Sequence, residues 1–114
     1  MKSLARNLLD WSGERFPFIN VISGFVMYFM VAMTAQKLTA GDANLNVMQI
    51  IAGGLSITLL FLIMRISDEH KDYQIDLELF PNRVLQSGRV TLTHLRWLGV
   101  LAIITQLALC VWMD

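Results

Sequence analysis

Cysteine is almost absent from this 114-residue chain, because Cys110 is the only one. A disulfide within the chain is therefore excluded, and the position of this thiol in an apolar run favours a buried, unreactive side chain. The sequence also lacks paired Cys and His residues and the pattern H-E-x-x-H, which argues against a zinc site. Proline is limited to Pro17 and Pro81, so proline breaks no helix between these positions.

Charged residues are missing from three long runs, although they make up 16% of the chain and sum to a net charge of zero. The runs are Phe16 to Gln36, Ala43 to Met64 and Trp97 to Met113, with 21, 22 and 17 residues. A helix needs about 20 apolar residues to cross a hydrocarbon layer of ~30 Å. We therefore predict an all-α integral membrane protein that forms one domain over residues 1–114. Its three transmembrane helices are expected at about 16–36, 46–66 and 95–113.

Before the first span, residues 1–15 carry leucines and Trp11 at roughly helical spacing, together with three basic side chains. This pattern predicts a short amphipathic segment at the membrane interface. The first span is longer than the apolar region of a signal peptide, and no small-residue cleavage site follows it. We therefore expect this span to be retained.

Small residues mark two further features. Gly41 and Asp42 predict a turn in the short polar link between the first two spans. Gly53, Gly54 and Ser56 form a small-residue patch in the second span, and such patches let membrane helices approach closely.

Residues 65–96 form a polar segment with five basic and five acidic side chains. The second helix is expected to continue into it, because no glycine or proline intervenes before Pro81. Four carboxylates fall within nine residues, at Asp68, Glu69, Asp72 and Asp76. On a helix these would share one broad face, where like charges repel unless a cation offsets them. Acidic side chains beside lipid are costly, so the cluster predicts a functional site.

Two interpretations of this segment follow from the residue types alone. Asp and Glu suit Mg²⁺, which proteins commonly hold through one or two carboxylates plus substrate phosphates. Lys71, Arg83 and Arg89 suit phosphate oxygens, so the segment can present a metal-bridged diphosphate or phosphate ester. Alternatively, its charges pair with one another in a solvated segment. For His70 we favour a structural or interfacial role over metal binding, because the other histidine, His94, is 24 residues away.

The basic residues also predict an orientation. Three precede the first span, one lies in the link 37–46, and five lie in residues 65–96. Because cytoplasmic loops are enriched in Lys and Arg, the amino terminus and the acidic segment are expected in the cytoplasm. The link and Asp114 are then expected on the opposite side of the membrane, which we take to be the inner, cell membrane.

The acidic cluster resembles the first aspartate-rich motif of the UbiA family of intramembrane prenyltransferases, N-D-x-x-D-x-x-x-D. The chain has D-E-H-K-D-Y-Q-I-D at 68–76, with Asp68 in place of Asn and Glu69 in place of the first Asp. The family often continues with N-R-P-L-P-S-G, and the chain has N-R-V-L-Q-S-G at 82–88, where Val84 and Gln86 replace the prolines. Both motifs in order, after two spans and before a third, give a fairly specific signal.

This resemblance implies the first third of a helical bundle of about nine spans. The family transfers a prenyl group from a prenyl diphosphate to an acceptor, often an aromatic ring, with Mg²⁺ holding the diphosphate. By resemblance, the catalytic residues would be Asp68, Glu69, Asp72 and Asp76. The metal ligands among them would be Glu69, Asp72 and Asp76, and Lys71 and Arg83 would contact the diphosphate.

The family's second aspartate-rich motif does not occur in these 114 residues. The chain is therefore expected to be a fragment, to work with a partner, or not to catalyse. The alternative function is a non-catalytic three-span scaffold or assembly subunit that binds another membrane protein through the small-residue patch. A CDP-alcohol phosphotransferase is disfavoured, because its pattern D-G-x-x-A-R is absent. The expected partners are a prenyl diphosphate, an unidentified acceptor, membrane lipids, and a second membrane chain or copy, but no nucleic acid.

Overall fold

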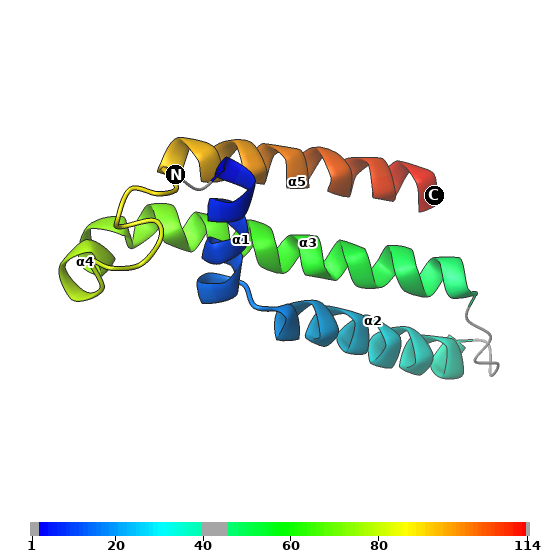
Figure 1. Cartoon of the computed structure of the whole chain (residues 1–114). Coiled ribbons are helices and arrows are strands. Elements are labelled where there is room, and N and C mark those ends of the chain that lie inside the picture. Colours follow the sequence, from blue (N-terminus) through cyan, green and yellow to red (C-terminus); the bar gives the residue numbers. More distant parts are fainter. Residues whose placement is uncertain (1–2, 40–45, 114) are drawn as a thin grey trace.

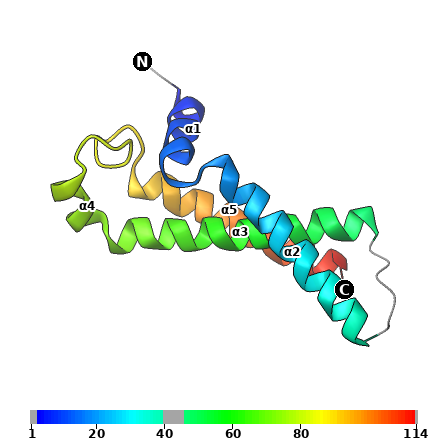
Figure 2. The same cartoon turned by 90° about the horizontal axis from the view of Figure 1, so that it is seen from below.

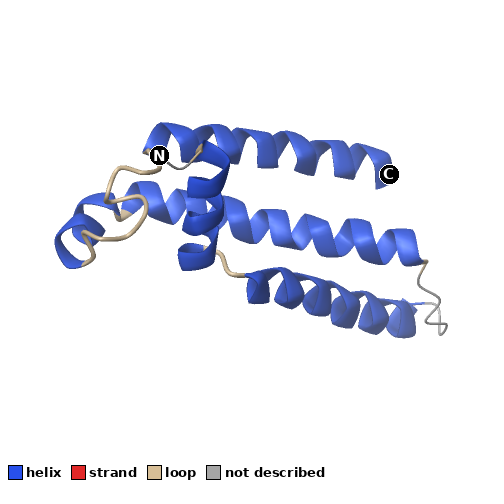
Figure 3. Cartoon of the chain, viewed as in Figure 1, coloured by secondary structure: helices blue, strands red, loops and turns tan. Residues whose placement is uncertain are grey.

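The computed structural model describes residues 3–39 and 46–113, and every regular element in these ranges is a helix (Figure 3). The prediction of an all-α fold is confirmed for this part of the chain. The helices are α1 (Leu4–Arg15), α2 (Phe18–Thr39), α3 (Val47–Lys71), α4 (Tyr73–Leu79) and α5 (Leu92–Met113).

Three of these helices, α2, α3 and α5, are long and apolar enough to cross a membrane, which indicates an integral membrane protein. They lie at the three predicted spans. The main difference is that α3 continues to Lys71, past the predicted end at 66, while α5 begins at Leu92 rather than at 95. The predicted amphipathic segment forms α1. The turn predicted at Gly41 and Asp42 lies outside the described residues.

Side chains at the helix starts explain where α3 and α5 begin. Asn46 accepts a hydrogen bond from the Met48 amide at 2.8 Å, and Gln49 Oε1 accepts one from the Asn46 amide at 3.3 Å. This reciprocal capping box satisfies amides that have no partner within the helix. At α5, the side chains of Thr91 and His94 each accept from the other's amide at 3.2 Å. His94 therefore has a structural role in a helix cap.

In the arrangement of the spans, α3 lies between α2 and α5 and packs on both (Figure 1). Helix α1 lies crosswise to the spans at one end of this layer. Helix α4 and the loop that returns to α5 lie at the same end (Figure 2). The polar segments of the described chain are thereby gathered at one end of the molecule.

The small-residue patch is used for packing within the chain. Its two glycines lie against the rings of Tyr28 and Phe25 in α2, so closely that a Cβ on either glycine would overlap a ring. Ser56 accepts a hydrogen bond at 2.7 Å from Gln106 Nε2 of α5. The patch thus joins α3 to both flanking helices.

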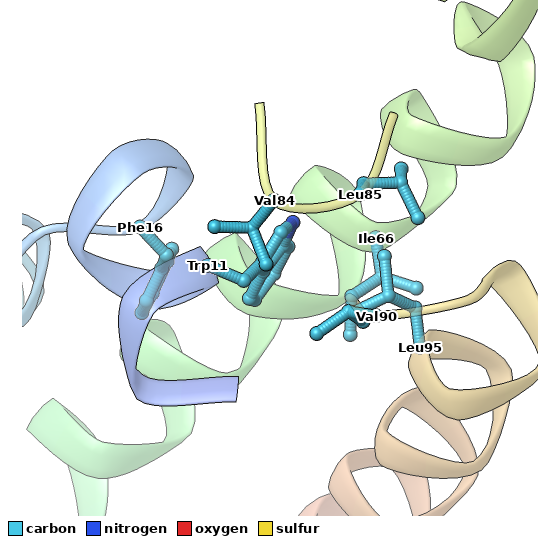
Figure 4. Close-up of a cluster of buried hydrophobic side chains, with 7 residues drawn as sticks. All are labelled: Trp11, Phe16, Ile66, Val84, Leu85, Val90 and Leu95. Carbon is cyan, nitrogen blue, oxygen red and sulfur yellow. The ribbon is translucent and has the colours of Figure 1, made fainter. Parts of the chain in front are cut away.

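A cluster of buried hydrophobic side chains lies at the polar end of the molecule (Figure 4). It contains Trp11 of α1, which is 1% exposed, together with residues of α3, of the loop after α4 and of the start of α5. Its members are Trp11, Phe16, Ile66, Val84, Leu85, Val90 and Leu95. Many apolar side chains of the spans are exposed instead, which suits contact with lipid.

Candidate functional site

The acidic motif straddles a break in the helix. Helix α3 continues past Arg65, as predicted, but it ends at Lys71, and Asp72 separates it from α4. The backbone hydrogen bonds continue across the break, because the Asp72 amide donates to Asp68 O at 2.8 Å and the Asp76 amide donates to Asp72 O at 2.9 Å. Aspartate is a poor residue for a helix interior, and three aspartates at this spacing repel one another. The break at Asp72 therefore falls among the repelling carboxylates.

The aspartates of the motif differ in their surroundings. Asp76 has a side chain that is only 14% exposed, and its Oδ2 lies 3.5 Å from Arg83 Nη1. Asp68 is more exposed and lies 3.8 Å from the Nζ of Lys71, a distance at which an exposed pair contributes little stability. The Asp72 carboxylate makes no capping hydrogen bond to α4.

Glu69 is placed differently from the aspartates, since it is 1% exposed and points into the protein. Its Oε1 accepts a hydrogen bond from Arg15 Nε at 2.8 Å, and its Oε2 accepts one from Trp11 Nε1 at 3.2 Å. Both carboxylate oxygens are thus engaged by α1. Coordination of a metal by Glu69 would require these contacts to break.

The second motif, residues 82–88, forms the compact loop that follows α4. Val84 and Leu85 are buried in the core cluster, while Arg83 turns toward Asp76 and its guanidinium lies 3.9 Å from the centre of the Phe80 ring. Gly88 has φ +88, a conformation that glycine adopts at little cost. The two sequence motifs therefore meet at the pair formed by Arg83 and Asp76.

The fit to Mg²⁺ is better for Asp72 and Asp76 than for Glu69. Among the described residues, no three His, Cys, Asp or Glu side chains form a group that could hold a metal ion by themselves. Mg²⁺ bound to a substrate phosphate needs only one or two carboxylates, because phosphate oxygens and water supply the other ligands. Asp72 and Asp76 are one helical turn apart in sequence, whereas both oxygens of Glu69 accept hydrogen bonds from α1.

A pocket of about 270 Å³ opens beside the motif, between α2 and α3. Three polar side chains and three apolar ones line it: Asn20, Arg65 and Asp68, with Phe16, Phe61 and Met64. Asn20 and Arg65 have no role in the function expected from the sequence motifs. Asn20 had no distinct sequence signal, because Ser23, Thr34 and Gln36 are further polar residues in the same uncharged run. Arg65 stands one helical turn before Asp68, on the same side of α3.

Other candidate side chains lie away from this pocket. His70 lines a groove between α3 and α5, and its Nδ1 lies 2.9 Å from the Ile66 carbonyl oxygen. The structural or interfacial role expected for His70 stays a prediction. Lys71 is largely exposed, and Cys110 is exposed as well, so the expectation of a buried thiol is wrong.

Comparisons with protein-family models, with curated proteins and with solved structures found no significant match to this chain. The functional interpretation therefore rests on the residues and contacts described above.

Proposed function

We propose that the polar end of this chain is the amino-terminal half of a Mg²⁺-dependent prenyl diphosphate site. In this proposal, the chain belongs to a UbiA-like prenyltransferase that transfers a prenyl group to an acceptor. The observation that supports it most is the contact between Asp76 and Arg83, 3.5 Å apart, because it joins the two motifs of the resemblance in one place. A carboxylate for a metal and a guanidinium for phosphate oxygens are then side by side.

The acidic and the basic residues would have different roles in the site. Asp72 and Asp76 would hold Mg²⁺, which when bound to diphosphate stabilises the negative charge that develops as the diphosphate departs. Arg83 is held beside Asp76, where it can meet diphosphate oxygens, and Lys71 is an exposed second cation nearby in sequence. In the transfer, the bond between the prenyl carbon and the diphosphate oxygen breaks, and its electron pair leaves with the diphosphate. The acceptor carbon then bonds to the allylic cation and loses a proton.

The pocket between α2 and α3 suits an amphiphilic substrate. Asn20 and Arg65 can contact an anionic head group, and the apolar residues can contact the first part of a hydrocarbon chain. A prenyl diphosphate combines these two chemistries. Because the acidic motif supplies only one side of the site, the remaining ligands would come from residues outside this chain or from a second membrane chain.

We place the polar end at the cytoplasmic face of the inner membrane. Among the described residues, Lys37 belongs to α2 at the far end of the spans, whereas the other basic side chains belong to α1, to the polar half of α3, to the loop after α4, and to the start of α5. Positively charged segments are retained in the cytoplasm. A soluble diphosphate head group would reach the site from that side.

The scaffold function has less support from the structure. In that alternative, another membrane protein binds the small-residue patch, but the patch already packs against Tyr28 and Phe25 of α2 and bonds to Gln106 of α5. A partner at this patch would have to displace one of the chain's own helices. For this reason we favour the prenyl diphosphate site.

The proposal is tested by binding of a non-hydrolysable prenyl thiolodiphosphate to the detergent-purified chain. With Mg²⁺ present, Arg65→Gln should weaken binding by roughly tenfold, since hydrogen bonds to charged groups are worth about 1.5–3 kcal/mol. Lys37→Gln also removes one positive charge, but from the end of α2 that lies far from the pocket, and it should leave binding unchanged. Absence of binding by the wild-type chain, or equal weakening by both substitutions, would contradict the proposal.

A further inference from the structure

We propose that α1 is a clasp that positions the 82–88 loop, and that Glu69 and Glu14 are positioning residues rather than ligands of metal or substrate. The role of this clasp in binding rests on the proposed function, because the loop it holds carries Arg83. The clasp itself is defined by contacts between α1 and segments more than fifty residues away in the sequence.

The inner side of the clasp is built on Glu69. The carboxylate is buried, and both of its oxygens accept hydrogen bonds from α1, one from Arg15 and one from Trp11. A buried carboxylate needs such partners, since an unpaired charge is costly to keep out of water. The Trp11 ring in turn belongs to the core cluster at the polar end (Figure 4). Glu69 thereby fixes where α1 crosses α3.

The outer side of the clasp holds the loop. Glu14 Oε1 accepts a hydrogen bond from the Val84 amide at 2.8 Å. Farther along α1, Asn7 Nδ2 donates to the Arg89 carbonyl oxygen at 3.1 Å, and Asp10 forms an ion pair with the Arg89 guanidinium. The loop is thus attached to α1 at both of its ends.

The contact between Glu14 and the loop lies one residue away from Arg83 of the candidate site. The Val84 amide that Glu14 holds directly follows Arg83, and the Arg83 side chain extends to Asp76. A loop that moved away from α1 would carry Arg83 away from Asp76. The position of this cation therefore depends on α1, although α1 itself contributes no residue to the acidic motif.

Two departures from the family pattern coincide with the contacts of the clasp. Val84 stands where the pattern has proline, and proline has no N–H to donate to Glu14. Glu69 stands where the pattern has aspartate, and its additional methylene group extends the reach of the carboxylate toward Arg15 and Trp11. In this chain, contacts with α1 therefore hold a loop that two prolines would otherwise stiffen.

Glu69→Gln, Arg15→Met and the double variant test this inference, with two measurements on the full chain. The first is hydrogen exchange of residues 4–15 and 82–90, which needs no ligand. The second is the affinity of the prenyl thiolodiphosphate in Mg²⁺. Glu69→Gln should speed exchange in both segments by roughly tenfold and weaken binding, since it leaves the Arg15 charge unpaired. Adding Arg15→Met should restore most of both properties, because neither member of the ion pair then carries a charge.

Rescue by Arg15→Met separates a positioning residue from a metal ligand, since a lost ligand cannot be replaced by changing Arg15. If Glu69→Gln weakens binding without faster exchange and without rescue, Glu69 is a ligand and the inference is overturned. Unchanged exchange in both segments would also overturn it. Failure of the wild-type chain to bind the probe would count against the proposed function alone, because exchange still reports on the clasp.

Two further variants keep the test decisive if Glu69→Gln does not fold. Glu14→Leu removes the acceptor of the Val84 amide from a more exposed position, and it should speed exchange in residues 82–90. Glu78→Gln removes an exposed carboxylate from α4, and it should leave exchange in both segments unchanged. Equal effects of these two substitutions would contradict a specific role for α1.

Discussion

The close approach of α2 and α3 at Gly24 gives a prediction whose size follows from the structure. A Cβ at this position would lie 3.2 Å from the Thr58 backbone nitrogen and 3.3 Å from its Cα. Carbon atoms in favourable contact are about 3.5–4.0 Å apart. Backbone atoms cannot rotate away, so Gly24→Ala requires the two helices to separate by a few tenths of an ångström.

The side chain of Thr58 adds to this cost. The new Cβ would lie 2.5 Å from Thr58 Oγ1, which donates a hydrogen bond to the Gly54 carbonyl oxygen at 2.8 Å. Rotation of the hydroxyl would break that bond. Overpacking costs about 1–3 kcal/mol, whereas replacing glycine by alanine in a helix contributes up to ~1 kcal/mol of stability. We expect Gly24→Ala to lower the free energy of unfolding by about 1–2 kcal/mol.

Unfolding in mixed micelles with increasing SDS, followed by far-ultraviolet circular dichroism, measures this difference. Gly13→Ala in α1 is the matched control, because no atom lies within 4 Å of its new Cβ. The control should be neutral or stabilise the chain by up to ~1 kcal/mol. If Gly24→Ala matched or exceeded the stability of Gly13→Ala, the close packing of α2 on α3 would be refuted.

Three further predictions concern single contacts. Trp11→Phe keeps an aromatic ring in the core but leaves Glu69 Oε2 without its donor at 3.2 Å, so the free energy of unfolding from chemical denaturation should fall by about 1–3 kcal/mol. An unchanged denaturation midpoint would count against the buried contact. Gly88→Ala places a Cβ in open space, but the backbone φ of +88 is unfavourable for alanine, so the free energy of unfolding in the same assay should fall by about 1–2 kcal/mol. A stabilised variant would contradict the left-handed conformation. Gln106→Leu removes the 2.7 Å hydrogen bond to Ser56, but it also removes Gln106 Oε1, a buried acceptor without a partner. The free energy of unfolding should therefore change by less than about 1 kcal/mol. A loss above ~2 kcal/mol would show that the hydrogen bond is needed to join α3 to α5.

The sequence was sufficient to predict the three spans, because the absence of charge over about twenty residues is a local property, and its main physical explanation is a helix that crosses a membrane. It also predicted that α3 would continue past Arg65. It did not predict the break at Asp72, because residues 65–80 include neither glycine nor proline, the residues that usually end a helix. There the repulsive spacing of Asp68, Asp72 and Asp76 was the informative signal.

The sequence could not separate Glu69 from its acidic neighbours. By resemblance, Glu69, Asp72 and Asp76 had the same expected role, because all three fall in one motif. The structure places Glu69 against α1, through contacts with residues 54 and 58 positions away. Such a partner has no local sequence signal.

Asn20 was overlooked for a related reason. It lies in the first span, far in the sequence from the acidic motif, and only the packing of α2 on α3 brings it to the pocket that Asp68 also lines.

The measurement that tests the central proposal most directly is the Mg²⁺ dependence of prenyl thiolodiphosphate binding. It compares the wild-type chain, the double variant Asp72→Asn/Asp76→Asn, and Glu78→Gln as a control that removes an exposed carboxylate of α4. We expect Mg²⁺ to tighten binding to the wild type and to the control by roughly tenfold or more, which corresponds to ~1.4 kcal/mol, and to have no effect on the double variant. Binding that is independent of Mg²⁺, or that survives the double substitution, would contradict the assignment of Asp72 and Asp76 as the metal side of a diphosphate site.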